Sequence, residues 1–337
     1  DQFGEVDVQD LCSRLAEAGY LHRAGENYHW TNEAYPADTI SLRSVTSDNF
    51  IIIDITGQPQ VIGEVDFVSA LTTVHEKAIY LHGAQQYHVE HLDFKERKAY
   101  VKQVDTDYYT DAIRYTQVRV LEIADIAASR TAGLHVWSHG DVLVRSQVVG
   151  FKKIKFFTNE NIGAGQLELP ENEMHTTSYW ITLQRPLLES LPFTISERQS
   201  GMFGLLRALE SVATLLLMCD GRDLATAVGE RPPAPGASES AVLNEAQDLS
   251  AWSSEPWVNG QKEFFEPNLY LYDAYPGGIG FSEPLFRAHE LLVQKTRELI
   301  QACPCDAGCP SCVGPVGDLA PRAKEAALAI LDRLLGG

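Results

Sequence analysis

Apolar positions in the first 45 residues follow a helical spacing and then an alternating one. They recur at intervals of three or four from Val8 to Ala18, and Gly19 follows, which predicts an amphipathic helix with a glycine at its end. Two short alternating segments on either side of a turn at 24–27 predict a hairpin. A helix followed by a hairpin is typical of the second half of a winged helix, where both DNA contact and protein docking are open interpretations.

Between residues 46 and 190 the hydrophobic pattern changes to a period of two, which predicts strands. The predicted strands are 50–55, 61–65, 78–82, 86–92, 99–104, 116–123, 133–137, 142–149, 152–157 and 166–169. Many short strands separated by turn residues favour antiparallel, barrel-like β structure.

The remaining residues alternate between helical and extended patterns. An apolar helix is predicted over 203–219, and a strand over 268–272 runs into a glycine-rich turn at 276–280. Two amphipathic helices are predicted over 283–302 and 321–335, the second with a proline in its first turn. A proline-rich stretch interrupts this region at about 230–262 and is interpreted as a loop insertion.

These patterns predict an α+β chain with three parts. Residues 1–45 form a winged-helix-like module, and residues 46–190 form an antiparallel, β-rich, barrel-like region. Residues 191–337 form a mixed α/β C-terminal domain that carries the loop insertion and a cluster of cysteines. A length of 337 residues is compatible with two or three domains at about 150 residues each.

The charge balance restricts how the chain could bind nucleic acid. A net charge of −19 argues against binding over the whole surface, because contacts to phosphates need lysine and arginine. One basic patch without an intervening acid contains Arg145, Lys152, Lys153 and Lys155. If 151–157 is a strand, Lys153 and Lys155 share a face with two phenylalanines, as in grooves that bind single-stranded DNA. A solvated strand edge protected by lysines explains the pattern equally well.

Cellular location follows from the absence of targeting signals in the given sequence. No window reaches the roughly 18 apolar residues of a membrane span, and no secretory signal is visible. We therefore expect no membrane partner. The sequence starts at Asp1 without a methionine, so we expect it to be part of a longer cytoplasmic protein. Four of the six cysteines fall within ten positions, a clustering that favours metal binding in a reducing compartment over disulfides.

The cysteine cluster is the strongest chemical signal. Cys303, Cys305, Cys309 and Cys312 have the spacing C-x-C-x₃-C-x₂-C, and Gly308 and two prolines supply turns between them. Zn²⁺ prefers tetrahedral sets of thiolates, and four cysteine ligands leave no open position, so the predicted zinc is structural. An iron–sulfur cluster uses the same four thiolates and stays an alternative at this point.

Other catalytic signals are weak. His88-x-Glu90 lacks the nearby P-C-x-x-C of zinc deaminases, and His75-Glu76 lacks the second histidine of H-E-x-x-H. The glycine turn after Asp273 could hold a phosphate, but it lacks the full G-x-G-x-x-G spacing and is better explained as a backbone turn. No G-x-x-x-x-G-K-[ST] motif occurs, so we expect no ATP hydrolysis by this chain alone.

Several segments together resemble a known family. The runs 272–280 and 303–312 are similar to the zinc-binding C-terminal region of YprA/MrfA-like superfamily 2 DNA helicases, which are related to fungal RecQ4-type helicases. The resemblance continues through 206–210, 218–220 with Asp223, 80–85, 35–37 and 41–43. It therefore covers nearly the whole chain, except the insertion at about 230–262. It assigns the four cysteines as zinc ligands and transfers no DNA-contact residue.

The resemblance implies a parent enzyme that translocates 3′ to 5′ on single-stranded DNA and takes part in DNA repair. ATP and Mg²⁺ would bind only in the motor domains of that parent chain, in the bacterial cytoplasm at the nucleoid. This segment would guide or clamp single-stranded DNA, weakly when alone. Two alternatives stay open: a motor-less DNA-binding or interaction subunit of a phage-defence system, and an independent hydrolase that uses the glycine turn.

Overall fold

The computed structural model describes residues 7–25, 27–31, 49–128, 135–230, 266–315 and 320–336. The chain divides into two compact units, Asp1–Asp48 and Asn49–Gly337. The domain boundaries predicted at 45 and 190 stay predictions. The predicted insertion at about 230–262 lies, beyond Glu230, outside the described residues.

The first unit contains a helix and a hairpin, in the predicted order. Helix α1 (Val8–Glu17) begins where the side chain of Asp7 accepts hydrogen bonds from two backbone N–H groups of the first turn. Strands β1 (Leu21–Ala24) and β2 (Asn27–Trp30) then pair in antiparallel fashion. All ten residues of α1 keep some solvent exposure, since none is buried within this unit.

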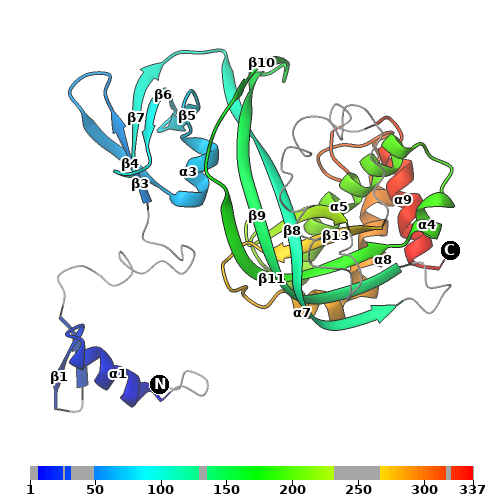
Figure 1. Cartoon of the computed structure of the whole chain (residues 1–337), viewed down its shortest axis with the longest axis horizontal. Helices are drawn as coiled ribbons and strands as arrows, with labels where there is room; N and C mark the ends of the chain where they lie inside the picture. The colour runs from blue at the N-terminus through cyan, green and yellow to red at the C-terminus, as the bar shows by residue number, and fades with distance from the viewer. Residues whose placement is uncertain are drawn as a thin grey trace, which may run out of the picture. The chain divides into compact units, whose positions relative to one another are not determined.

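The second unit begins with a small five-stranded sheet (Figure 1). Its strands are β3 (Asn49–Asp54), β4 (Gln60–Asp66), β5 (Ile79–His82), β6 (Gln85–Asp93) and β7 (Lys98–Val104), in the order β4-β3-β7-β6-β5. Helix α3 (Phe67–Thr73), which the hydrophobic pattern did not predict, connects β4 to β5 and begins at the side chain of Asp66. Strands β3 and β7 pair in parallel, and the other pairs are antiparallel.

A larger, six-stranded antiparallel sheet follows. Its strands are β8 (Tyr108–Ala128), β9 (His135–Lys155), β10 (Asn161–Gln166), β11 (Asn172–Leu183), β12 (Leu224–Glu230) and β13 (Pro267–Asp273). Strand β9 pairs with β8 along one edge, and with β11 and β10 along the other. The sheet continues through β13 to β12, so it takes strands from both sides of residue 190.

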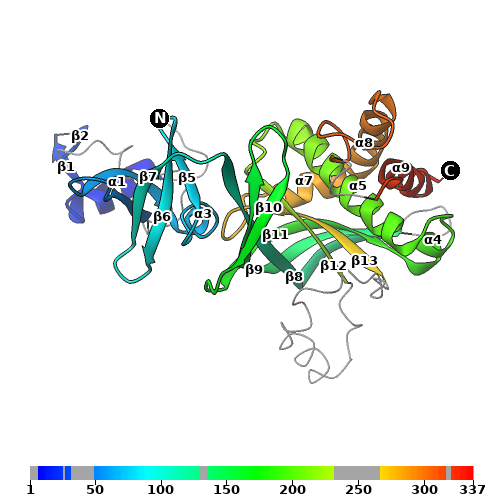
Figure 2. The ribbon, with the colours of Figure 1, turned by 90° about the horizontal axis from the view of Figure 1, so that it is seen from above.

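Helices cover one face of this sheet (Figure 2). They are α4 (Arg185–Glu189), α5 (Ile195–Leu217), α7 (Ser282–Arg287), α8 (His289–Ala302) and α9 (Ala323–Leu334). Leucines of α5, α8 and α9 pack with β11 and β13 into the largest hydrophobic core. Strand β13 is buried along its whole length, because a second apolar cluster that includes Trp180 and Tyr270 lies on the opposite face.

Helix α5 is long and apolar enough to cross a membrane by length and composition alone. Half of the relevant window is buried inside the protein, as expected for a core helix. It starts with a capping box in which Thr194 and Glu197 satisfy each other's backbone N–H groups, and it ends at Met218 in the left-handed conformation. We interpret α5 as the central helix of the zinc-binding half of the chain.

Several predicted bounds are wrong. The three predicted strands 133–137, 142–149 and 152–157 all overlap one strand, β9, which runs from His135 to Lys155. Phe157 therefore lies beyond the strand, in a turn with φ of 67°, and does not share a strand face with Lys153. The last helix starts at Ala323, so Pro321 precedes it and is not in its first turn.

Candidate metal centre

The four cysteines lie in the loop between α8 and α9. Helix α8 ends at Ala302, and Cys303 adopts extended backbone angles, which turn the chain away from the helix axis. Gly308 has φ of 143°, and a Cβ there would lie 2.8 Å from the carbonyl oxygen of Gly314. Glycine is thus required at this position on two grounds, backbone angle and space. The turn is closed by a 3.0 Å hydrogen bond from the N–H of Cys312 to the carbonyl of Cys309.

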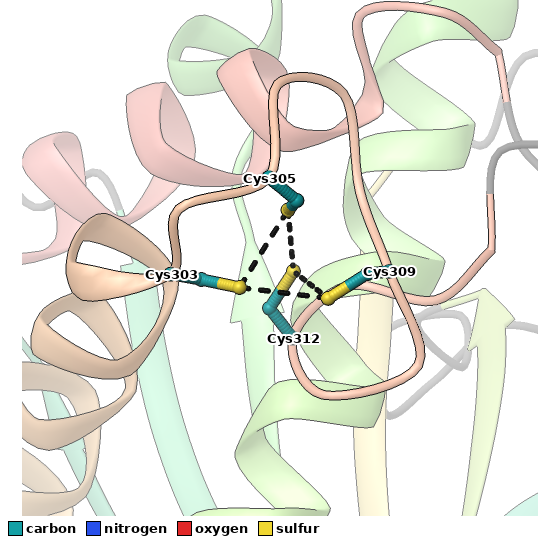
Figure 3. Close-up of side chains that lie close together, drawn as sticks. All are labelled: Cys303, Cys305, Cys309 and Cys312. Carbon is teal, nitrogen blue, oxygen red and sulfur yellow. Dashed lines mark hydrogen bonds between the residues drawn. The ribbon is translucent and has the colours of Figure 1, made fainter.

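The four thiol groups point toward one another (Figure 3). The Sγ atom of Cys303 lies 3.6 Å from that of Cys305 and 3.5 Å from that of Cys309. The Sγ atom of Cys312 lies 3.4 Å from that of Cys305 and 3.7 Å from that of Cys309. All four sulfur atoms lie within 4.8 Å of one another, so the set can surround a single ion.

These separations fit a tetrahedral thiolate site. With Zn–S bonds of about 2.3 Å, the sulfurs of a regular tetrahedron lie about 3.8 Å apart. The observed 3.4–3.7 Å is much longer than the roughly 2.05 Å of a disulfide bond, and all four cysteines are free thiols. The four thiolates bind four different irons in a [4Fe–4S] cluster and two irons, in pairs, in a [2Fe–2S] cluster, so either cluster needs a wider set of sulfurs. The donor set therefore fits one zinc ion.

Two of the thiols differ in how readily they lose a proton. The backbone N–H of Ser311 and the neighbouring thiol of Cys303 lower the pKa of Cys309 to about 7. Burial raises the pKa of Cys312 to about 12, consistent with its 1% exposure in the helical core. Burial therefore disfavours a free thiolate at Cys312, whereas coordination to a metal ion would stabilise one.

The glycine turn after β13 already holds a carboxylate. The Oδ2 atom of Asp273 accepts hydrogen bonds from the backbone N–H groups of Ile279 at 2.6 Å, Gly280 at 2.8 Å and Phe281 at 3.3 Å. The hydroxyl of Thr177 donates to the same oxygen at 3.1 Å. Because the donors that a phosphate would need already bind Asp273, the turn is a structural feature and offers no phosphate site.

The structure brings only part of the predicted basic patch together. Lys152, Lys153 and Lys155 lie at the end of β9, whereas Arg145 lies roughly 25 Å away along the strand at about 3.3 Å per residue. Arg145 contacts two carboxylates, Glu173 at 2.7 Å and Glu171 at 3.6 Å. Of the lysines, Lys155 lies 3.6 Å from a carboxylate oxygen of Asp107. Lys153 lies 5.1 Å from the ring centre of Tyr108.

The core contains a buried histidine pair that the sequence pattern does not predict. The Nε2 atoms of His135 and His289 lie 3.3 Å apart, and the hydroxyl of Tyr179 lies 2.6 Å from Nδ1 of His289. Burial lowers the pKa of His135 to about 4 and that of His289 to about 3. The two histidines are 154 residues apart in sequence, so no local spacing could have revealed the pair.

Comparisons with known proteins agree with this geometry. The family model of the MrfA Zn-binding domain matches residues 205–313, which include all four cysteines. The chain is 36% identical over 336 residues to the ATP-dependent helicase YprA of Bacillus subtilis, covering 99% of this chain and 40% of YprA. It is 25% identical over 316 residues to the ATP-dependent helicase HRQ1 of Saccharomyces cerevisiae, covering 92% of this chain and 27% of HRQ1.

A solved structure shows the same relationship. The crystal structure of the DUF1998 helicase MrfA bound to DNA is 35% identical and superposes with a TM-score of 0.57, over 99% of this chain and 40% of MrfA. The chain thus spans well under half the length of these helicases. The zinc-binding domain match and the four-cysteine cluster together support a structural zinc. The chain carries a MrfA Zn-binding domain and is homologous to the C-terminal region of the YprA, MrfA and Hrq1 helicases.

Proposed function

We propose that this chain is the C-terminal accessory region of an ATP-dependent 3′–5′ DNA helicase or translocase that acts in DNA repair. The observation that supports this most is the four-cysteine cluster within a zinc-binding domain whose relatives are helicases. The motor domains that bind ATP and Mg²⁺ would belong to the same parent chain. That parent protein would act in the bacterial cytoplasm, at the nucleoid.

The zinc ligands in this proposal are Cys303, Cys305, Cys309 and Cys312. Their sulfur–sulfur distances of 3.4–3.7 Å support a single tetrahedral ion. A closed set of four thiolates leaves no position for a substrate, so the zinc has a structural role. It would fix the end of α8 to the loop that leads into α9, and thereby hold both helices against α5.

The DNA contact in this proposal lies at the end of β9. Lys152 and Lys153, with Lys155, place three cations within four residues of one strand. Phe157, fully exposed in the adjoining turn, adds an aromatic ring on which a base could stack. Arg145, with its two glutamates, is the weakest member of the predicted set. A site this small would bind single-stranded DNA weakly without the motor domains.

A salt series tests the DNA contact. Labelled single-stranded DNA is titrated by fluorescence anisotropy, where four cations give a log–log salt slope no steeper than about −3, at roughly −0.7 per phosphate. The double substitution Lys153→Glu and Lys155→Glu is expected to abolish binding with the fold retained. Lys102→Glu with Lys295→Glu makes the same charge change on exposed residues elsewhere and is the matched control.

The two double variants separate the possible outcomes. Loss of binding in the Lys153/Lys155 variant alone supports a contact at the end of β9. Equal losses in both variants would mean that net charge, not this surface, governs binding. Unchanged affinity in the Lys153/Lys155 variant would overturn the assignment and place the contact on another surface.

A further inference from the structure

The side chain of Lys324 lies beside the cysteine cluster, although it comes from the first turn of α9. Its Nζ atom donates to the carbonyl oxygen of Cys303 at 2.8 Å and to that of Cys305 at 2.5 Å. The same atom lies 3.6 Å from the Sγ atom of Cys305. Lys324 is only 8% exposed, so its ammonium group has little access to water.

This environment is unusual for a lysine. Within the described part of the chain, Lys324 contacts no carboxylate, and its partners are two carbonyls and one cysteine sulfur. A buried ammonium without an anion is strongly unfavourable, and carbonyl dipoles offset only part of that penalty. The first turn of a helix is also where the backbone dipole favours anions over cations. A negative charge close by would offset most of the remaining penalty.

The cysteine cluster supplies that charge when it binds zinc. Four thiolates around one Zn²⁺ carry a formal charge of −2, with no other cation among the described residues as close to Cys305. A hydrogen bond from an ammonium to a thiolate is charge-assisted and stronger than a bond between neutral groups. The ammonium and the tetrathiolate therefore stabilise each other.

We propose that Lys324 is a positioning residue of the zinc site, whose ammonium offsets one of the two negative charges of the zinc tetrathiolate and slows the loss of zinc. The inference rests on the proposed assignment of the four cysteines as ligands. It makes the docking of α9 and the retention of zinc interdependent, because the positive charge comes from α9 and the ligands follow α8. It also identifies Cys305 as the thiolate that Lys324 holds directly.

A purely structural role for Lys324 makes a different prediction. The carbonyl of Cys303 follows the last turn of α8. In the alternative role, the ammonium of Lys324 stabilises the negative end of that helix and has no effect on the zinc. In that case its contribution to stability would be the same with and without zinc. In the proposed role, removal of zinc leaves the ammonium buried without its anion, and the lysine becomes destabilising.

The first measurement is the rate of zinc transfer from the full 337-residue chain to a chromogenic chelator at neutral pH. Lys324→Met, which keeps the length and apolar character of the stem, is expected to release zinc about 10–100-fold faster, the range typical of lost outer-shell partners. Lys324→Arg keeps the charge and is expected to restore most of the retention. Lys295→Met removes an exposed lysine of α8 and is expected to leave the rate unchanged.

The second measurement is the thermal midpoint of the wild type and of Lys324→Met. Each is measured with zinc bound, and again with the additional substitution Cys309→Ser, which removes one ligand and with it the zinc. Lys324→Met is expected to lower the midpoint with zinc bound, and to leave it unchanged or raise it without zinc. If Lys324→Met does not fold, Lys324→Gln provides the same comparison, since it keeps donors and removes the charge.

The outcomes distinguish this inference from the ligand assignment. A wild-type chain without zinc would contradict the ligand assignment itself. Zinc in the wild type, with an unchanged release rate in Lys324→Met, would overturn the role of Lys324 alone. An equal drop in thermal midpoint with and without zinc would also overturn it, in favour of the helix-capping role.

Discussion

Gly204 of α5 and Val313 of the cysteine loop are in contact close to the backbone: a Cβ at Gly204 would lie 2.7 Å from the Cβ of Val313. Only a residue without a side chain allows α5 and the loop to approach this closely. Gly201, one turn earlier, has the same relationship to Ala326 of α9, at 2.7 Å. The cysteine loop and α9 thus both pack against the face of α5 that carries Gly201 and Gly204.

This contact predicts the effect of Gly204→Ala. The added methyl group must push the loop away from α5, so we expect the free energy of unfolding to fall by about 1–3 kcal/mol. A Cβ at Gly221 would have nothing within 4 Å, so Gly221→Ala is the matched control and should change stability by less than about 0.5 kcal/mol. Urea denaturation of the zinc-bound proteins measures both. Equal stability of Gly204→Ala and the wild type would show that the loop does not sit on α5 as described.

Asp273 provides the second prediction. Replacing it by alanine leaves the N–H groups of Ile279, Gly280 and Phe281 without their shared acceptor, and we expect a loss of about 2–4 kcal/mol in unfolding free energy. Asp273→Asn keeps an acceptor oxygen and should lose less.

Isothermal titration with inorganic phosphate should detect no binding by the wild type. If the wild type binds phosphate, and Asp273→Asn binds it more tightly, the structural role of this turn is contradicted.

The buried histidine pair predicts how stability depends on pH. The folded-state pKa values of His135 and His289, about 4 and about 3, are below the unfolded value of about 6.5. The unfolded chain therefore binds more protons than the folded chain. The contribution of the two histidines to the free energy of unfolding is fully present above pH 6.5 and is lost as the pH falls. One to two protons give a slope of about 1.4–2.7 kcal/mol per pH unit between pH 6.5 and 5.

Denaturation curves from pH 7.5 to 5, with zinc content measured in parallel, check this slope. Replacing both histidines by glutamine should flatten it. His91, exposed and 2.8 Å from Glu76, serves as the control through His91→Gln. A slope that persists in the double variant while zinc stays bound would assign the acid sensitivity to other groups.

The missing phosphate-binding motif predicts that this chain alone does not hydrolyse ATP. The sequence contains no G-x-x-x-x-G-K-[ST], and the glycine turn that could have held a phosphate binds Asp273 instead. Phosphate release, measured with and without single-stranded DNA, should equal the buffer background. Turnover that follows the chain through successive purification steps would show that a nucleotide site has been missed.

Local spacing in the sequence predicts part of this structure. The cysteine cluster is identifiable because its ligands lie within ten residues, and the mixed α and β composition with a C-terminal cysteine cluster is confirmed. The hydrophobic pattern starts α5 at 203 instead of Ile195, because residues 195–202 are mostly polar and Gly201, like Gly204 inside the predicted helix, lowers helix propensity. The reason for these glycines is tertiary: both face close neighbours that no local pattern describes.

Local patterns in the sequence do not predict the features that depend on long-range contacts. The hydrophobic pattern predicts three strands where β9 is continuous. Residues of β9 pair with β8, β10 and β11, so its polar positions do not alternate on a single face. The sequence pattern indicates only that Lys324 belongs to an amphipathic helix, because its partners Cys303 and Cys305 lie about twenty residues earlier. The histidine pair and the hydrogen bonds to Asp273 likewise exist only in the folded chain.

Metal analysis of the purified chain is the decisive measurement for the zinc site. Zinc and iron are measured together in the wild type and in Cys309→Ser. We expect about one zinc per chain in the wild type, no stoichiometric iron, and loss of both zinc and several degrees of thermal stability in Cys309→Ser. A folded wild-type chain without zinc, or one with stoichiometric iron, would contradict the assignment of the four cysteines to a structural zinc.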